Sequence, residues 1–376
     1  MKIKVTPKTP LTSYLSTTKH HTGHHIKLMT ESLTIKNNAS NSDPRNTVCM
    51  HYVLAACQRA TDAGLDQNKC LDYADLQPNL LSQPQARISA LQYEKMVSYI
   101  ALTLNDELLM LGGKARSRVG CFNLMCQLAI HEPTLRQAIL RSLQFYNLLW
   151  GDIYFRLSSN NELAYLSIHF SDPTINSDHT TTDCNLVLLH RFFSWLINQH
   201  IPLNHVSCSF PKPSYHKEHD RLYRCPVHYS EAKDALAFPK TLLATPVAQT
   251  KDTLSLFLKS APGNLMAIPN NENSLTTQIR TVLASTLYTD PPSLEQIASE
   301  LNTTTQTIRR RLKKENASYQ EIKDQLRQDS AINFLCNSTL PINDIALRLG
   351  FSEPSTFHRA FKKWTGATPG DYRRQS

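Results

Sequence analysis

Apolar residues recur at both helical and strand spacings between residues 48 and 262. Spacings of three and four residues predict helices at 53–63, 135–149 and 186–197. Alternation of apolar and polar residues predicts strands at 153–157, 163–170 and 206–210. The turn-forming pair Asn160-Asn161 separates the first two strands, and Pro211 ends the third. The mixture predicts an α+β domain over residues 47–262, large enough for its own core.

The chain changes character on both sides of this domain. Residues 1–46 are polar and lack sustained apolar periodicity, which predicts a disordered tail. After the domain, a Pro-, Gly- and Asn-rich interval predicts a linker at 263–274. Residues 275–376 show only helical periodicity, and this predicts an all-α domain.

The all-α region contains a weak internal duplication. One apolar quartet has members spaced i, i+3, i+4 and i+7, and it occurs as Leu294, Ile297, Ala298 and Leu301 and again 48 residues later as Ile342, Ile345, Ala346 and Leu349. A second helix follows each quartet, with inward pairs Ile308/Leu312 and Phe357/Phe361. Between the two helices stand Asn302 and Gly350, residue types that tolerate the left-handed conformation needed after a helix. Each unit is therefore a predicted helix-turn-helix, with Ser293 and Pro341 at the starts of the first helices.

The outward face of each second helix carries long donors without acidic neighbours. Long donors of this kind suit an anionic major groove, because Arg reads guanine, Gln reads adenine and Lys contacts phosphate. The base-reading candidates are Gln306, Arg309, Arg310, Ser355, His358 and Arg359. The phosphate candidates are Lys313, Lys314, Lys362, Lys363 and Arg373. The alternative, a solvated basic helix in a small bundle, explains one such face but not two behind the same apolar quartet.

A helix over residues 318–335 is expected to join the two units, because this stretch is periodic and contains neither Pro nor Gly. Such a helix would fix the distance between the two recognition helices. Two rigidly spaced recognition helices can enter successive major grooves about 34 Å apart on one face of the duplex.

These residues resemble the AraC/XylS type of transcription regulators. Residues 350–369 (GFSEPSTFHRAFKKWTGATP) with Tyr372-Arg373 are similar to that family's C-terminal signature, and Ser293 to Leu312 are similar to its first helix-turn-helix. Asn302 and Asn316 depart from the pattern, since many members carry Gly there. The resemblance implies a sequence-specific transcription factor that binds double-stranded DNA and works with RNA polymerase.

A weaker resemblance extends upstream. Residues 78–89, 132–139 and 225–229 are similar to landmarks of the N-terminal domain in ornithine-utilisation-like members of the family. This implies that residues 47–262 sense a small-molecule effector and pair two subunits into a homodimer. No effector-binding residue can be transferred, and an inert spacer remains the alternative.

Charge and cysteine usage agree with this organisation. The formal net charge is +9, of which residues 1–47 carry +5 and residues 275–376 carry +4. Residues 48–274 are therefore neutral, and their net charge does not favour binding to phosphate. The nine cysteines form no C-x-x-C pair, which favours reduced thiols in a cytoplasmic protein. The N-terminus resembles no signal peptide, and no apolar run approaches the ~20 residues of a membrane helix.

Two alternative functions differ in class. A DNA-repair enzyme of Ada type would need clustered zinc ligands around an activated cysteine. The nearest cluster is His216 and His219 beside Cys208 and Cys225, in a Pro-rich stretch that predicts an ordinary loop. His20, His21, His24 and His25 of the tail could also bind a metal, although a solvated polar tract explains them. We therefore expect no catalytic residues, metal or cofactor. The second alternative is a nucleoid-like protein that binds DNA without specificity.

Overall fold

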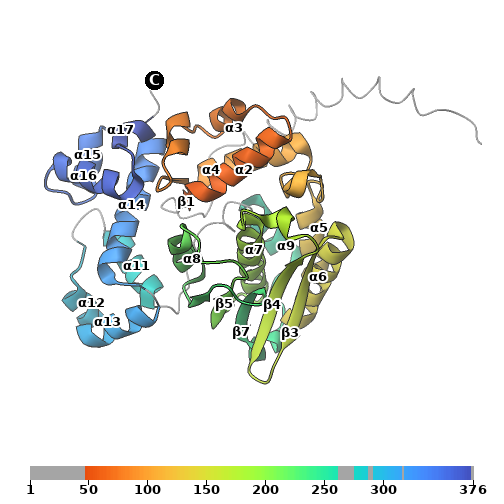
Figure 1. Cartoon of the computed structure of the whole chain (residues 1–376). Coiled ribbons are helices and arrows are strands. Elements are labelled where there is room, and N and C mark those ends of the chain that lie inside the picture. The colour runs from red at the N-terminus through yellow and green to blue at the C-terminus, as the bar shows by residue number, and fades with distance from the viewer. Residues whose placement is uncertain (1–46, 261–274, 287–290, 316, 374–376) are drawn as a thin grey trace, which may run out of the picture. The chain divides into compact units, whose positions relative to one another are not determined.

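The computed structural model describes residues 47–260, 275–286, 291–315 and 317–373. The predicted tail with its four histidines and the predicted linker at 263–274 lie outside these residues. The described chain has an α+β region followed by a region of helices only, which confirms the predicted fold class (Figure 1).

The α+β region begins with a helical layer built around a short antiparallel ribbon. Its strands are β1 (Thr47–Cys49) and β2 (Arg87–Ser89), in which Val48 lies opposite Ile88. The surrounding helices are α2 (Met50–Asp62), α3 (Gln67–Tyr73), the 3-10 helix η1 (Pro78–Ser82) and α4 (Ala90–Leu104). Ser89 and Gln92 form a capping box at the start of α4, so the ribbon passes directly into this helix.

A five-stranded sheet occupies the rest of this region, in the order β3-β4-β7-β5-β6. The strands are β3 (Ile153–Ser159), β4 (Leu163–Phe170), β5 (His205–Ser207), β6 (Val227–His228) and β7 (Asp234–Pro239). All neighbouring pairs are antiparallel except β5 and β6. The hairpin predicted around Asn160 is confirmed, and the Asn160 side chain accepts two backbone N–H bonds that close its turn.

Five described helices accompany this sheet. They are α5 (Cys121–Ala129), α6 (Leu135–Trp150), α7 (Thr180–Leu196), α8 (His216–Tyr223) and α9 (Lys251–Ser260), with short 3-10 turns η2 (Leu111–Gly113), η3 (Pro173–Asn176) and η4 (Lys240–Ala244). Helices α6 and α7 contact each other, α6 packs on β3, and α7 packs on β4 and β7. The helices predicted near 53, 135 and 186 correspond to α2, α6 and α7.

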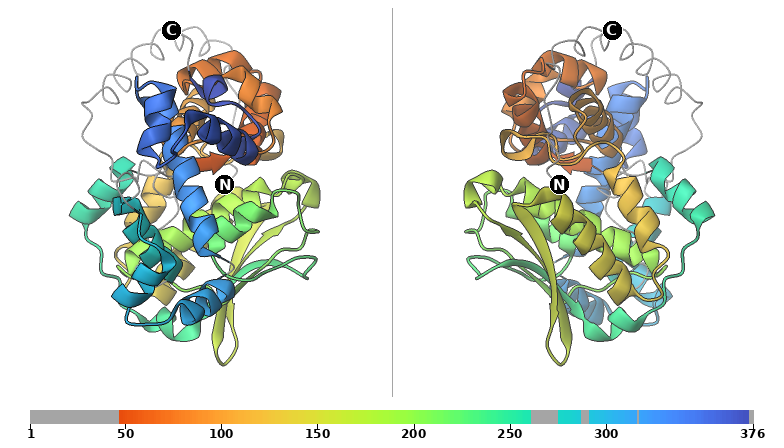
Figure 2. Two further views of the ribbon diagram at one scale, coloured as in Figure 1. Left: turned by 90° about the vertical axis from the view of Figure 1, so that its left-hand side faces the viewer. Right: turned by 90° about the vertical axis from the view of Figure 1, so that its right-hand side faces the viewer.

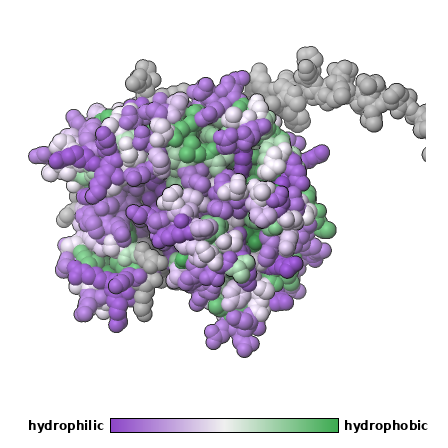
Figure 3. Space-filling view, in the orientation of Figure 1, coloured by the Kyte–Doolittle hydropathy of each residue, from purple (hydrophilic) through white to green (hydrophobic). Residues whose placement is uncertain are grey.

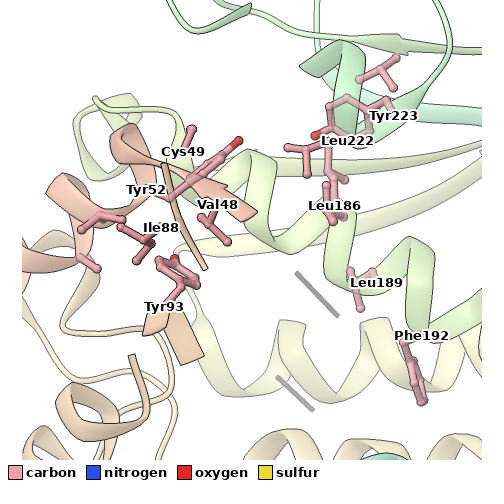
Figure 4. Close-up of a cluster of buried hydrophobic side chains, with 14 of the residues drawn as sticks. Val48, Cys49, Tyr52, Ile88, Tyr93, Leu186, Leu189, Phe192, Leu222 and Tyr223 are labelled. Atoms are coloured by element: carbon pink, nitrogen blue, oxygen red, sulfur yellow. The ribbon is translucent and has the colours of Figure 1, made fainter. Parts of the chain in front are cut away.

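The core is continuous from the β1–β2 ribbon to α7 and α8. Figure 4 shows Val48, Tyr52 and Ile88 on one side of this cluster, and Leu186 and Tyr223 on the other. All five are buried, with Val48 at 3% exposure and Tyr223 at 6%. The helical layer and the sheet region therefore share one hydrophobic interior.

The C-terminal region consists of seven described helices. They are α11 (Leu275–Thr286), α12 (Leu294–Glu300), α13 (Thr305–Lys314), α14 (Tyr319–Asn337), α15 (Ile342–Arg348), α16 (Pro354–Thr365) and α17 (Pro369–Tyr372). The joining helix predicted at 318–335 is α14. In Figures 1 and 2 it runs between the group formed by α12 and α13 and the group formed by α15 and α16.

Candidate DNA-binding interface

The first helix-turn-helix is formed by α12 and α13, and its start is fixed by a cap. Ser293 Oγ accepts the N–H of Gln296 at 3.3 Å, and Gln296 Oε1 accepts the N–H of Ser293 at 2.5 Å, which together make a capping box. After α12 the chain turns at Asn302, whose φ of 48° is left-handed. Asn is one of the few non-glycine residues that adopt this conformation readily, so the predicted role of Asn302 is confirmed.

Packing decides which face of α13 is presented to solvent. Ile308 and Leu312 are buried at 0% and 1% exposure, as predicted for the inward pair. The same geometry leaves Gln306, Arg309, Arg310 and Lys313 exposed. Within the described part of the chain, these three cationic side chains form no ion pair. In Figure 3, hydrophilic side chains lie along the lower edge of the corner where α12 and α13 lie, below a small hydrophobic patch.

The second helix-turn-helix, α15 and α16, repeats the arrangement with a larger core. Gly350 follows α15 with a φ of 73°, and a Cβ there would stand 3.2 Å from the Arg327 guanidinium. Phe357 and Phe361 are both fully buried. They leave an exposed face on α16, made up of Ser355, His358, Arg359, Lys362 and Lys363. The Ser355 hydroxyl donates to Glu353 at 3.2 Å, so this candidate already has a partner.

Helix α14 connects the two helix-turn-helix units. It packs on α11 in the first half of the region and on α15, α16 and α17 in the second. Its apolar stripe, which includes Ile322 and Leu326, is buried. Near the second unit, Arg327 lies 5.0 Å from the centre of the Phe351 ring and donates to the Gly350 carbonyl at 3.3 Å. A continuous helix with partners at both ends makes a stiff spacer.

Arg373 and Lys314 are the two phosphate candidates that the structure does not show as exposed side chains. Arg373 is mostly buried and donates to the Leu340 carbonyl at 2.7 Å, while its Nε and Nη2 atoms are fully buried. In this conformation Arg373 ties the residue after α17 to the loop before α15 and is not presented to a ligand. Lys314 is the last residue of α13, and its side chain lies outside the described part of the structure.

Sequence reasoning missed one cation on the first recognition helix. Arg311 is exposed on α13 beside Arg310. It was missed because it directly precedes the buried Leu312, so the helical projection places it at the edge of the presented face. The run of three arginines, 309 to 311, was the available signal.

The loop predicted around His216 and His219 is wrong, because these residues lie in helix α8. His219 is buried, and its Nε2 is 3.0 Å from Asp183 Oδ2 on α7. The Pro-rich flanks indicated a loop, but long-range contacts hold the helix. Burial also raises the pKa of Cys225 to about 12, which keeps this thiol protonated. An Ada-type reaction would need the opposite, a thiolate.

All nine cysteines are free, and six of them are buried. Over the described ranges, no helix combines the length and apolar character that crossing a membrane requires.

Two protein families match this chain. Residues 64–247 match the N-terminal arabinose-binding domain of AraC transcription regulators, and residues 297–375 match a helix-turn-helix domain family. The chain is 25% identical over 322 residues to the ornithine utilization regulator of Pseudomonas aeruginosa, which covers 86% of this chain and 95% of that protein. It is 28% identical over 164 residues to the transcriptional regulator VqsM of the same species, which covers 44% of this chain and 47% of VqsM.

Among solved structures, the transcriptional regulator CdpR from Pseudomonas aeruginosa is 22% identical, with 82% of this chain and 96% of that chain covered and a TM-score of 0.31. The matched families and relatives are transcription regulators, a non-enzymatic class, and this confirms that the chain is not an enzyme. With an effector-binding type of domain followed by a double helix-turn-helix, the chain belongs to the AraC family of transcription regulators.

Proposed function

We propose that the protein reads a bipartite operator by placing α13 and α16 in two successive major grooves. The base-reading side chains are Gln306, Arg309, Arg310, Ser355, His358 and Arg359. Exposed Lys313, Lys362 and Lys363 contact the phosphates, together with Lys314. Arg373 joins them only if it leaves the Leu340 carbonyl.

The observation that carries this proposal is that α13 and α16 present two equivalent basic faces and that one helix, α14, joins their units. In each unit two buried apolar residues turn the cationic side of the second helix outward. Helix α14 packs directly on α15 and α16 and reaches the first unit through α11, which contacts α13, so the separation of the units is set by the protein and not by a flexible connection. This geometry supports recognition of two half-sites about one helical turn apart.

We further propose that residues 47–262 form the effector-sensing and dimerisation domain, with a linker at 263–274 and the DNA-binding domain at 275–376. The neutral charge of the middle of the chain and its match to the arabinose-binding family support this division. The protein acts as a homodimer in the cytoplasm, together with RNA polymerase. The name of the P. aeruginosa relative, an ornithine utilization regulator, makes amino acids and polyamines the first compounds to test as effectors.

The test uses the full-length chain and a site selected from genomic DNA by sequencing bound fragments. Binding to the selected site is measured with excess random competitor DNA at moderate salt. An operator variant with about 5 extra base pairs between the half-sites turns one half-site to the opposite face of the duplex. We expect this insertion to weaken binding to the level of a single half-site.

Two results would contradict the proposal. If competitor and salt abolish binding to the selected site as fully as binding to random DNA, the protein behaves as the nucleoid-like alternative, whose affinity is purely electrostatic. If the selected site survives competition but tolerates the insertion, the two helices do not read a fixed spacing.

A further inference from the structure

Helix α8 has buried polar contacts on two sides. On one side His219 reaches Asp183 of α7 at 3.0 Å, and its Nδ1 lies 2.9 Å from the Tyr229 hydroxyl. The same Asp183 carboxylate accepts the Tyr52 hydroxyl of α2 at 3.1 Å. Asp183, His219 and Tyr52 are each at most 1% exposed. This side of α8 is therefore embedded in the interior of the effector-binding type of domain.

On its other side α8 is bound to the helix that joins the two DNA-reading units. Arg221 Nη2 donates to both carboxylate oxygens of Asp329 on α14, at 2.9 and 3.0 Å. One turn earlier, Glu218 pairs with Arg87 of β2, and Nη2 of this arginine reaches Glu218 Oε1 at 3.0 Å. Figure 1 shows α8 between α7 and α14, as these contacts require.

Three separate parts of the chain donate hydrogen bonds to the Asp329 carboxylate. Besides Arg221, its carboxylate accepts Arg280 of α11 at 2.9 Å and the Thr47 hydroxyl of β1 at 2.6 Å. The Asp329 side chain is completely buried. Burial alone would raise the pKa of Asp329, but Arg221 and Arg280, with Arg87 behind them, hold this pKa below its usual value. The carboxylate is thus charged at neutral pH.

Separating a buried ion pair is strongly unfavourable. Removing one partner of a buried ion pair leaves an uncompensated charge, so the pair is either formed or exchanged for another arrangement. Any rearrangement around Asp183 that shifts α8 must therefore carry Asp329 with it or release it. Because α14 packs directly on the second reading unit and reaches the first through α11, either outcome reaches the DNA-binding surface.

We propose that α8 transmits the state of the effector-binding domain to the DNA-binding domain through the Arg221–Asp329 ion pair, with Asp329 as the positioning residue of α14. The inference rests on the proposed function, because it assigns the route by which the same DNA-reading surface is regulated. Coupling of this type is reciprocal, so operator DNA must also alter the environment of α8.

The experiment measures hydrogen exchange of α8 in the full-length protein, with and without the selected operator, together with operator affinity well below the unfolding temperature. The test variant is Arg221→Gln, which leaves the Arg280–Asp329 pair in place to support folding. Arg280→Gln is the matched control, since it removes a bond to the same carboxylate without touching α8. Lys217→Gln controls for a charge change at an exposed position of α8.

In the wild type and both controls, we expect operator DNA to change the exchange rate of α8 at least about twofold. In Arg221→Gln this response should vanish, and operator affinity should shift by about fivefold or more, the lower end of common coupling. A purely structural pair would lower the unfolding temperature and leave both readouts as in the wild type.

Retention of the α8 response and of wild-type affinity in folded Arg221→Gln would overturn the coupling and leave the proposed DNA reading intact. Loss of the response in Arg280→Gln as well would also overturn it, because general weakening around Asp329 would then explain the data. If the wild-type chain binds no site specifically, the proposed function itself fails, and the coupling fails with it.

Discussion

Arg310 and Arg359 occupy equivalent positions on the two proposed recognition helices. Each stands two residues after the first buried side chain of its helix, Ile308 in α13 and Phe357 in α16. Both are exposed, and neither forms an ion pair over the ranges that the structure describes. An exposed, uncompensated guanidinium is free to make the bidentate contact with guanine that dominates direct readout.

We therefore expect Arg310→Ala and Arg359→Ala each to weaken operator binding by ~1–3 kcal/mol and to relax specificity at a few base pairs. Lys363→Ala, at a proposed phosphate contact, should weaken binding to all sequences about equally and reduce the salt dependence. Fluorescence anisotropy with the operator and with random duplexes checks both statements. Equal losses on operator and random DNA for the two arginine variants would refute base reading at these positions.

At the level of elements, some helices are specified by their local sequence, and others depend on long-range contacts. Helix α12 has a complete local specification, with a capping box at Ser293, an apolar stripe and a left-handed residue after its end. Helix α8 has little of this, because its N-terminus lacks a side-chain cap and its flanks are rich in proline. Its contacts to Asp183, Arg87 and Asp329 supply what the local sequence does not.

The capping box gives an element-scale prediction. Ser293→Ala removes the acceptor for the N–H of Gln296 and should destabilise the protein by about 1 kcal/mol. Ser352→Ala is a control at an exposed serine outside the caps, for which we expect no comparable change. Chemical denaturation followed by circular dichroism measures both, and equal stability of the two variants would show that α12 does not depend on its cap.

For the whole molecule, an effector that binds one domain and alters operator binding by the other would test the coupling between the two domains. A ligand that binds only the folded form stabilises it by RT ln(1 + [L]/Kd), about 2.7 kcal/mol at a hundredfold excess over Kd. A thermal-shift screen of amino acids, polyamines, sugars, and aromatic and fatty acids should therefore find a stabilising compound. The same compound should alter operator affinity in the wild type and not in Arg221→Gln. A broad screen without any such compound would favour the inert spacer.

The sequence by itself determined the two DNA-reading units. Their helices are short and amphipathic, and those of the first unit are capped by Ser293 and Thr304. The 3.6-residue period of Ile308 and Leu312 was therefore enough to assign the exposed face. The hairpin around Asn160 and the α+β character of the first domain were predictable for the same reason, because alternation and turn residues act over a few positions.

Only the tertiary structure decided which charged residues are buried. Asp329 belongs to a polar stretch of α14 that looks like a solvated face, and its partner Arg221 is 108 residues away in the sequence. Local periodicity in the sequence cannot predict such a pairing, because the ion pair forms only when α8, α11 and β1 pack against one side of α14. Burial then converts an ordinary aspartate into the charge that ties the two domains together, since a buried carboxylate requires partners that an exposed one does not.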